Sequence, residues 1–286
     1  MATWLKNRQR LGLRWVTGTG LAAVAVACAS TVAAGLAADH GNDRPVVAPA
    51  ADMRWASVEP QGVQQSPLWG NGQEPSQGTL QRLKAGMTAG PFRESGETIG
   101  VVIGGTVTLR TPAPYASAPL GPGSWFRIPP GSAYSVQAQT GREAVLGLIQ
   151  VEPGDAGALT ELTHTAAKPA LPTAIPAKAV QVRTVEAGDL AMTGLWGNRQ
   201  RTASCALVRQ PAGKLALMRS YPADTHLIIV TGSAAVLLEG QKPSKPLGPG
   251  SYMAIPAGAP YLTRAAKDQN CLMLEYHPGP VDAPTR

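Results

Sequence analysis

The sequence repeats itself at a constant offset of 127 residues. Leu68-Trp69-Gly70-Asn71 returns as Leu195-Trp196-Gly197-Asn198, and the stretch from Leu120 to Ser124 returns as that from Leu247 to Ser251. Because the offset is kept through every loop, the repeat predicts two copies of one folded module with the same internal loop lengths. The same offset relates Arg82 to Arg209, Gly86 to Gly213, Gly105 to Gly232, Pro129 to Pro256, Gly131 to Gly258, and Tyr134 to Tyr261.

The composition favours short strands over helices. The 286 residues are 44% hydrophobic, enough for one or two cores, and they include 32 glycines and 26 prolines. Short β-rich runs between glycine and proline turns predict an all-β sandwich or barrel that is repeated twice. The predicted strands include 99–103, 106–109 and 125–128 in the first copy, and 227–230, 234–238 and 252–255 in the second.

The repeat and the composition together divide the chain. Residues 1–38 are predicted as a targeting segment and residues 39–51 as a flexible leader. The first module is predicted over residues 52–153 and the second over residues 180–286, with a short tail at its end. Residues 154–179 between them are rich in proline, alanine and threonine and lack apolar periodicity, so they are predicted as a linker.

The first 38 residues resemble a signal peptide. A basic stretch from Met1 to Arg14 precedes an uncharged run from Trp15 to Ala38 that ends in small residues. The interpretation is export to the periplasm or the cell exterior. Two alternatives stay open: an uncleaved membrane anchor, since the run is long enough to span a bilayer, and a lipoprotein acylated at Cys28. Contact with a membrane is expected only through this segment.

The basic character of the chain is concentrated in the same segment. The formal net charge is +7, and Lys6, Arg8, Arg10 and Arg14 supply four of these charges before the first acidic residue, Asp39. A nucleic-acid-binding protein is expected to carry a stripe of Lys and Arg with interleaved aromatics, and none is present. Nucleic acid is therefore not an expected partner.

Two cysteines remain after the predicted signal peptide. Cys205 and Cys271 both lie in strand-like runs of the second copy, 204–208 and 271–276. In an oxidising compartment such a pair is a candidate disulfide, and the alternative is two buried free thiols. Neither is a candidate nucleophile, because no histidine recurs beside them.

The turn skeleton of both copies resembles a known motif. Gly123-x5-Pro129-x-Gly131-x2-Tyr134 and its repeat from Gly250 to Tyr261 are similar to the second signature motif of the cupin superfamily, with tyrosine where that family has histidine. Gly105 and Gly232 fall where the first cupin motif ends. The resemblance implies two tandem jelly-roll domains, a bicupin. The stretch from Cys271 to Asp282 also resembles a group of bicupins without assigned function.

The family's metal ligands are not retained. Cupins hold Fe, Mn or Zn with three histidines and one glutamate, which donate lone pairs to the metal. None of the four histidines of this chain falls on a ligand position, so neither a metal nor another cofactor is expected. By the resemblance, the glutamate position holds Thr98 or Thr225, the first two histidine positions fall near Phe92 and Glu94 or near Arg219 and Tyr221, and the third holds Tyr134 or Tyr261.

The polar residues at these positions are the candidate ligand-binding set. An arginine between tyrosines suits a carboxylate or a sugar-like molecule, and the alternative is that the same side chains only fill the barrel. By strand alternation His226 should point away from the face of Thr225, and Trp69 and Trp196 are interpreted as core residues. The candidates are Arg93, Glu94, Glu97 and Tyr134 in the first copy, and Arg219, Tyr221, Thr225 and Tyr261 in the second.

Three functional hypotheses follow. The favoured one is an exported, metal-free, non-catalytic bicupin that binds a small polar or anionic molecule or a partner, or that is structural in the cell envelope. The alternative is a metal-independent isomerase, epimerase or lyase acting on a small carboxylate or sugar-like substrate, with Glu94, Glu97 or a tyrosine as acid or base. The third is an enzyme with an unorthodox metal site near Glu94 and Glu97.

Overall fold

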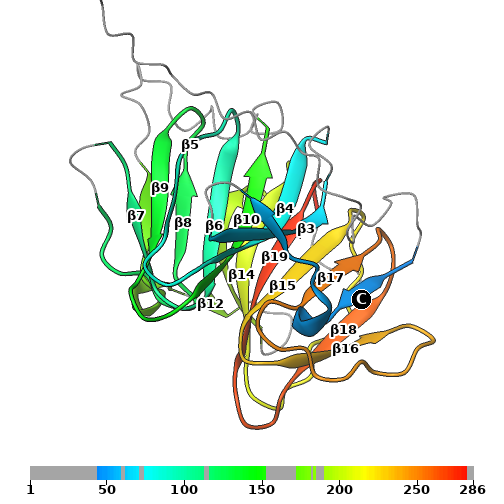
Figure 1. The fold of residues 1–286 in the computed structure, drawn as a ribbon. Helices are drawn as coiled ribbons and strands as arrows, with labels where there is room; N and C mark the ends of the chain where they lie inside the picture. Colours follow the sequence, from blue (N-terminus) through cyan, green and yellow to red (C-terminus); the bar gives the residue numbers. More distant parts are fainter. Residues whose placement is uncertain are drawn as a thin grey trace, which may run out of the picture. The chain divides into compact units, whose positions relative to one another are not determined.

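The structure of the chain is a computed structural model built almost entirely of antiparallel strands (Figure 1). It describes residues 44–58, 62–70, 74–112, 116–152, 172–181, 183–184 and 190–281. The predicted targeting segment, residues 1–38, lies outside these ranges, as do Asn71 and most of the predicted linker. Within them, no helix is both long enough and apolar enough to cross a membrane.

Each module pairs a seven-stranded sheet with a smaller one, which confirms the predicted repeat of a jelly-roll sandwich. In the first module the large sheet has the order β11-β8-β6-β10-β4-β3-β2 and the small sheet β5-β9-β7. These strands are β2 (Ala56–Val58), β3 (Val63–Trp69), β4 (Ser76–Leu83), β5 (Thr88–Arg93), β6 (Glu97–Gly104), β7 (Val107–Arg110), β8 (Trp125–Ile128), β9 (Ala133–Ala138), β10 (Ala144–Val151) and β11 (Thr173–Ile175).

The second module repeats this arrangement. Its large sheet has the order β1-β17-β15-β19-β14-β13-β12, and β16 pairs with β18 in the small sheet. The strands are β1 (Val46–Ala48), β12 (Arg183–Thr184), β13 (Ala191–Gly197), β14 (Ser204–Gln210), β15 (Thr225–Thr231), β16 (Ala234–Leu238), β17 (Tyr252–Ile255), β18 (Tyr261–Ala265) and β19 (Cys271–His277). The predicted strands 125–128, 234–238 and 252–255 have these same bounds, and the others lie within one or two residues of them.

The two modules exchange their first strands. β1 precedes the first module in the sequence but pairs with β17 of the second, whereas β11 precedes the second module and pairs with β8 of the first (Figure 1). Each exchanged strand leads into a short 3-10 helix, η1 (Ala50–Asp52) or η3 (Ala177–Ala179). Residues 46–51 of the predicted flexible leader and 173–179 of the predicted linker are therefore ordered parts of the repeat.

Matching hydrogen bonds hold both exchanged segments. The backbone N–H of Ala50 donates to the hydroxyl of Ser251 at 3.0 Å, and that of Ala177 donates to Ser124 at 2.9 Å. Both acceptor serines are buried. The two bonds obey the 127-residue offset, so the exchange is a property of the repeated module rather than of one copy.

The large sheets of the two modules pack against each other. One apolar cluster contains residues of both, among them Ile99, Val101 and Ile149 from the first and Ile228, Val230 and Leu274 from the second. The opposite face of each sheet covers a separate core inside its own module. We call these two spaces the first and second barrel interiors. Each central strand thus has two buried faces, one toward its barrel and one toward the other module.

Aromatic rings join the two modules. Trp69 of β3 stacks on His226 of β15, with ring centroids 4.3 Å apart and planes inclined by 16°. Tyr252 and Tyr276 lie 5.8 Å and 5.6 Å from the same indole. The prediction that Trp69 and Trp196 are core residues is confirmed, since both are buried. The prediction that His226 points away from its own barrel is also confirmed, because its ring stacks on Trp69 of the other module.

Gly105 and Gly232, which the resemblance placed at the end of the first cupin motif, both need glycine. Their φ angles are +71° and +75°, in the left-handed region that other residues rarely adopt. A Cβ at Gly105 would lie 2.2 Å from the carbonyl oxygen of Glu143, and one at Gly232 would lie 2.0 Å from that of Asn270. The turn therefore fixes these positions in both copies.

The candidate disulfide is wrong. Cys205 and Cys271 are both free and buried. The strands β14 and β19 are paired, but Cys205 lies opposite Tyr276 and Cys271 lies opposite Gln210, at the two ends of the ladder. Cys205 also belongs to the core between the modules and Cys271 to the second barrel core, so the thiols face opposite sides of the sheet. The alternative of two buried free thiols is the arrangement observed.

The stacking of Trp69 predicts a large stability effect. Trp69→Ala removes a ring that contacts three aromatic side chains of the other module, so we expect a loss of about 3–5 kcal/mol in the free energy of unfolding. Urea unfolding followed by circular dichroism measures this loss. Leu217→Ala, at a side chain that is 50% exposed, should change stability by less than about 0.5 kcal/mol. Equal effects of the two substitutions would contradict the packing described.

The strand exchange predicts which module responds to each serine. Ser251→Ala leaves the Ala50 N–H without its acceptor, so amide hydrogens of β1 and β17 should exchange about tenfold faster. The mirror variant, Ser124→Ala, should have the same effect on β11 and β8 and leave β1 unchanged. Hydrogen exchange read by mass spectrometry resolves these peptides. Faster exchange of β1 in both variants would contradict the exchange.

Candidate functional site

The second barrel interior holds a cluster of charged and hydroxyl-bearing side chains around one carboxylate. Glu275 of β19 is fully buried at the centre. Its Oε2 accepts a hydrogen bond from Nη1 of Arg219 at 2.8 Å, and its Oε1 accepts one from Nη1 of Arg199 at 3.1 Å. Nε2 of His277 lies 3.0 Å from the same Oε1. We call Arg199, Arg219, Tyr221, Thr225, Tyr261, Glu275 and His277 the Glu275 cluster.

Strand geometry brings these residues together. Side chains alternate along a strand, so Thr225 of β15 and both Glu275 and His277 of β19 face the barrel. Arg219 is paired with Tyr261, the first residue of β18, through two backbone hydrogen bonds. Arg199 extends into the cluster from the turn between β13 and β14. Its side chain is 25% exposed, whereas its ion-pair partner Glu275 is fully buried.

The histidine of the cluster links the carboxylate to the wall of the barrel. Nδ1 of His277 lies 3.3 Å from the hydroxyl of Thr225, which can donate to it, and 3.2 Å from the carbonyl oxygen of Asp224, which can only accept. The ring of Tyr221 meets the imidazole edge-on, with centroids 4.7 Å apart. These contacts hold the imidazole in one orientation beside Glu275.

The charges of the cluster stabilise its carboxylate in the ionised form. Burial alone raises the pKa of Glu275, but the positive charge of Arg219, the hydrogen bond from His277 and the charge of Arg199 lower it further than burial raises it. The net result is a pKa well below the ordinary value of 4.5. Burial raises the pKa values of Tyr221 and Tyr261, so both tyrosines are neutral donors at physiological pH.

Arg219 has spare hydrogen-bonding capacity. Its Nη1 donates to Glu275, and the hydroxyl of Tyr221 also interacts with its guanidinium. Nε and Nη2 make no hydrogen bond of good geometry among the described residues, and the side chain is only 4% exposed. The hydroxyl of Tyr261 also makes no hydrogen bond of good geometry, although Thr225 lies within reach of it. The ring of Tyr261 lies under the guanidinium of Arg219 at 4.9 Å. Nε and Nη2 form the edge of a guanidinium that binds a carboxylate through two parallel hydrogen bonds.

The first barrel interior lacks this cluster. The positions equivalent to Arg219, Glu275 and His277 hold Phe92, Leu148 and Gln150. Phe92 packs on Tyr134, with ring centroids 5.3 Å apart, and both belong to or border the apolar core of that module. The ionic part of the site is therefore specific to the second copy.

The first-copy candidates separate in the structure. Tyr134 is buried in the barrel core, whereas Arg93 is exposed on the alternate face of β5 from Phe92. Glu94 is half-buried at the end of β5, where burial, followed by the charge of Glu152, raises its pKa.

Glu97 lies on the wrong face of its strand for the barrel. It is buried between the modules, where Nε1 of Trp196 donates to its Oε2 at 2.6 Å and Arg127 forms an ion pair with it. The prediction that Glu97 acts in the barrel, as a ligand or an acid–base residue, is wrong. Glu97 lies one position along the strand from a residue that faces the barrel. The hypothesis of an unorthodox metal site near Glu94 and Glu97 is weakened as well, because Glu97 faces the other module and not the barrel.

All four second-copy candidates lie in the cluster, and three further members were not predicted. All four are buried in the second module: Arg219, Tyr221, Thr225 and Tyr261. Both tyrosines belong to the core of its barrel. Arg199, Glu275 and His277 were missed. Glu275 and His277 were detectable, because they continue the buried alternation of Cys271 and Met273 along one strand face.

A transition metal of the kind held by cupins does not fit this set of residues. A guanidinium has no lone pair to donate, and the charge of Arg219 repels a cation at this place. The one buried carboxylate, Glu275, is already paired with two arginines. Among the described residues, no group of three or more His, Cys, Asp or Glu side chains is placed to hold a metal ion.

Comparisons with known proteins identify the fold. No protein-family model and no curated protein matches the chain. A glyoxylate-induced protein from Pseudomonas aeruginosa superposes with a TM-score of 0.64 at 16% identity, over 82% of this chain and 89% of that one. Protein Ylba from E. coli gives a TM-score of 0.60 at 12% identity, over 82% and 91%.

A third similar structure is an enzyme. Oxalate decarboxylase from Lactobacillus farciminis, solved as a formate complex, gives a TM-score of 0.56 at 14% identity, over 84% of this chain and 88% of that one. Identities this low are informative about architecture alone. The two-module architecture, the glycine and proline skeleton and these superpositions lead to one conclusion. The chain has the cupin fold, in the two-module form of a bicupin.

Proposed function

We propose that this bicupin binds a small carboxylate in its second barrel, without a metal and without catalysis. The observation that carries the proposal is the buried edge of Arg219, whose Nε and Nη2 make no hydrogen bond of good geometry among the described residues. Leaving a buried donor unpaired costs about 1–3 kcal/mol, more for a charged group, so an acceptor in this place stabilises the folded protein. A carboxylate supplies two acceptors in the matching geometry.

The charge of the Glu275 cluster also favours an anion. Two arginines face one glutamate, which leaves a net positive charge on these three side chains. The hydroxyl of Tyr261 offers a third donor beside the guanidinium. Among the similar structures, the oxalate decarboxylase was solved as a formate complex, and formate is a small carboxylate.

The enzymatic alternative has weaker support. An isomerase, epimerase or lyase without metal needs an acid–base group with a pKa near neutrality beside the substrate. The raised pKa values of Tyr221 and Tyr261 make them poor acids, and the lowered pKa of Glu275 makes it a poor base. Glu94 has a raised pKa, but it lies in the other module.

Carboxylate binding has a direct test at Arg219. Titration calorimetry with formate, oxalate and glyoxylate should detect binding to the wild type, and Arg219→Lys should weaken it about tenfold. Lysine keeps the charge that Glu275 needs but lacks the two-donor edge. Arg93→Ala, at an exposed arginine outside the barrel, is the matched control and should bind as the wild type does. The absence of binding by all three anions, or equal binding by Arg219→Lys, would contradict the proposal.

The Glu275 cluster predicts how stability depends on pH. The folded-state pKa of Glu275 is lowered, so its stabilisation is complete well above 4.5 and is lost as the pH falls below that value. Glu275→Gln should cost about 3–5 kcal/mol at pH 7, because it leaves two arginines without their counterion. The difference in the free energy of unfolding between the wild type and Glu275→Gln should be smaller at about pH 3.5 than at pH 7, and urea unfolding measures it. A variant as stable as the wild type at pH 7 would show that the ion pairs contribute nothing.

Export of the protein is a further proposal, and it rests on residues 1–38 alone. Mass spectrometry of the protein purified from its own cells distinguishes the three N-termini. Cleavage near Ala38 is the expected result. An acylated Cys28 would identify a lipoprotein, and an intact Met1 to Arg14 segment would identify an anchor or a protein that is not exported.

A further inference from the structure

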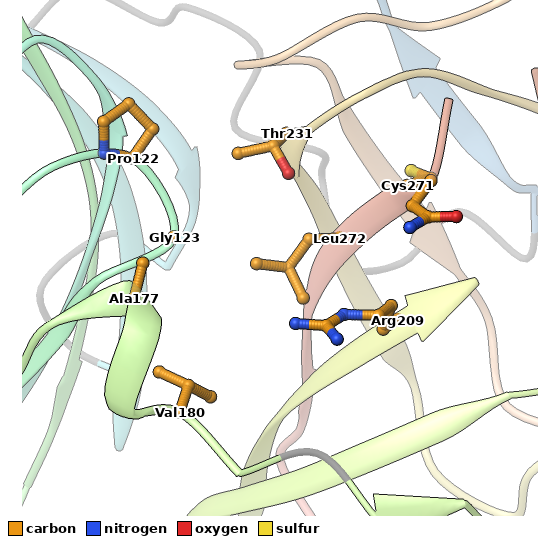
Figure 2. Close-up of a pocket in the computed structure, with 9 residues that line it drawn as sticks. Pro122, Gly123, Ala177, Val180, Arg209, Thr231, Cys271 and Leu272 are labelled. Carbon is orange, nitrogen blue, oxygen red and sulfur yellow. The ribbon is translucent and has the colours of Figure 1, made fainter. Parts of the chain in front are cut away.

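A pocket lies where the two modules meet. It has a volume of about 380 Å³ and opens between the turn at Pro122 and Gly123 of the first module and the paired strands β14 and β19 of the second (Figure 2). This volume is within the range of small-molecule sites in proteins, roughly 300–1,000 Å³. Its lining residues are Pro122, Gly123, Ala177, Val180, Arg209, Thr231, Asn270, Cys271 and Leu272.

Arg209 is the charged residue of this lining. Figure 2 shows its side chain beside Leu272 at the wall of the pocket. Arg209 is exposed, and no hydrogen bond, ion pair or ring contact joins its guanidinium to a residue within the described ranges. The side chain of Cys271 belongs to the second barrel core, so this residue brings no charge to the pocket. The pocket therefore presents one positive charge among apolar and uncharged polar groups.

The first module shows what an arginine at this position binds. Arg82 is the equivalent of Arg209. Its Nε lies 3.2 Å from Oε1 of Glu143, and its Cζ lies 4.0 Å from the centroid of the Trp55 indole. The guanidinium is thus paired with a carboxylate and stacked on an aromatic ring, the two interactions that arginine makes most favourably.

The second module has lost both of these partners. The sequence equivalent of Glu143 is Asn270, which lines the pocket and carries no charge. The equivalent of Trp55 is Val182, an aliphatic residue whose placement is outside the described residues. The repeat has therefore kept the arginine while replacing the carboxylate and the ring that satisfy it.

We propose that the pocket beside Arg209 binds an aromatic carboxylate, whose two parts replace the missing side chains. The carboxylate takes the place of Glu143 on the guanidinium, and the planar ring takes the place of the Trp55 indole. Apolar contacts from Val180, Ala177 and Leu272 suit the ring. The site is distinct from the second barrel, because Arg209 alternates with the barrel-facing Val208 and Gln210 along β14.

Benzoate is the probe for this site, and acetate and benzamide test its two halves. The wild type should bind benzoate, and acetate, which lacks the ring, and benzamide, which lacks the charge, should each bind at least about tenfold more weakly. Binding is followed by ligand-observed NMR and titration calorimetry on the full chain. Equal affinity for all three, or no benzoate binding at concentrations up to about 10 mM, would overturn the proposal.

Variants locate the binding. Arg209→Ala should weaken benzoate binding about tenfold or more, since it removes the anchor. Asn270→Glu should weaken it similarly, because the new carboxylate pairs with Arg209 as Glu143 pairs with Arg82. Asn270→Gln is the matched control: it also loses the bond that Asn270 accepts from the Ala212 N–H, but it adds no charge and should bind benzoate as the wild type does. Arg82→Ala should also leave benzoate binding unchanged.

The outcomes separate this site from the barrel site. Loss of benzoate binding in Arg219→Lys but not in Arg209→Ala would place benzoate in the barrel and overturn the proposal. Unchanged binding in both Arg209→Ala and Asn270→Glu would overturn it as well. Failure of formate to bind at Arg219 bears only on the barrel and leaves the test at Arg209 intact.

Discussion

The packing of the two large sheets on each other is the constraint on which the rest of the structure depends. The shared core places Trp69 of one module against His226, Tyr252 and Tyr276 of the other. Strand exchange adds the backbone to this contact, because β1 and β11 each complete the sheet of the other module. A single module would leave one apolar sheet face and one sheet edge exposed, both of which favour association. The duplication thus forms one folding unit.

This packing also explains why the polar residues divide between two environments. Each central strand is buried on both faces, so neighbouring residues reach different compartments. Glu97 meets Trp196 between the modules, whereas Thr225 meets His277 inside the second barrel. Buried charges need partners, and each compartment supplies them locally: Arg127 for Glu97, and Arg219 with Arg199 for Glu275.

The two proposed sites arise from the same process of divergence between the copies. In the barrel, the second copy has the ionic pair Arg219 and Glu275, where the first has Phe92 and Leu148. At the junction of the modules, both copies have an arginine, and only the first supplies its carboxylate. In the barrel, Nε and Nη2 of Arg219 make no hydrogen bond of good geometry among the described residues. At the junction, the exposed Arg209 lacks the carboxylate that pairs with Arg82.

The sequence by itself determined the fold, because the repeated glycines and prolines specify turns and the short apolar runs between them specify strands. The resemblance to the cupin motifs also predicts tyrosine and arginine at or near positions where that family has metal ligands, because the motif spacing assigns each position. Only the tertiary structure decided which side chains meet. Glu275 and Arg219 are 56 positions apart, and no local period relates them. Their contact, like the misassigned face of Glu97 and the separated Cys205 and Cys271, depends on sheet register and strand exchange, which are set by pairing between distant strands rather than by local sequence.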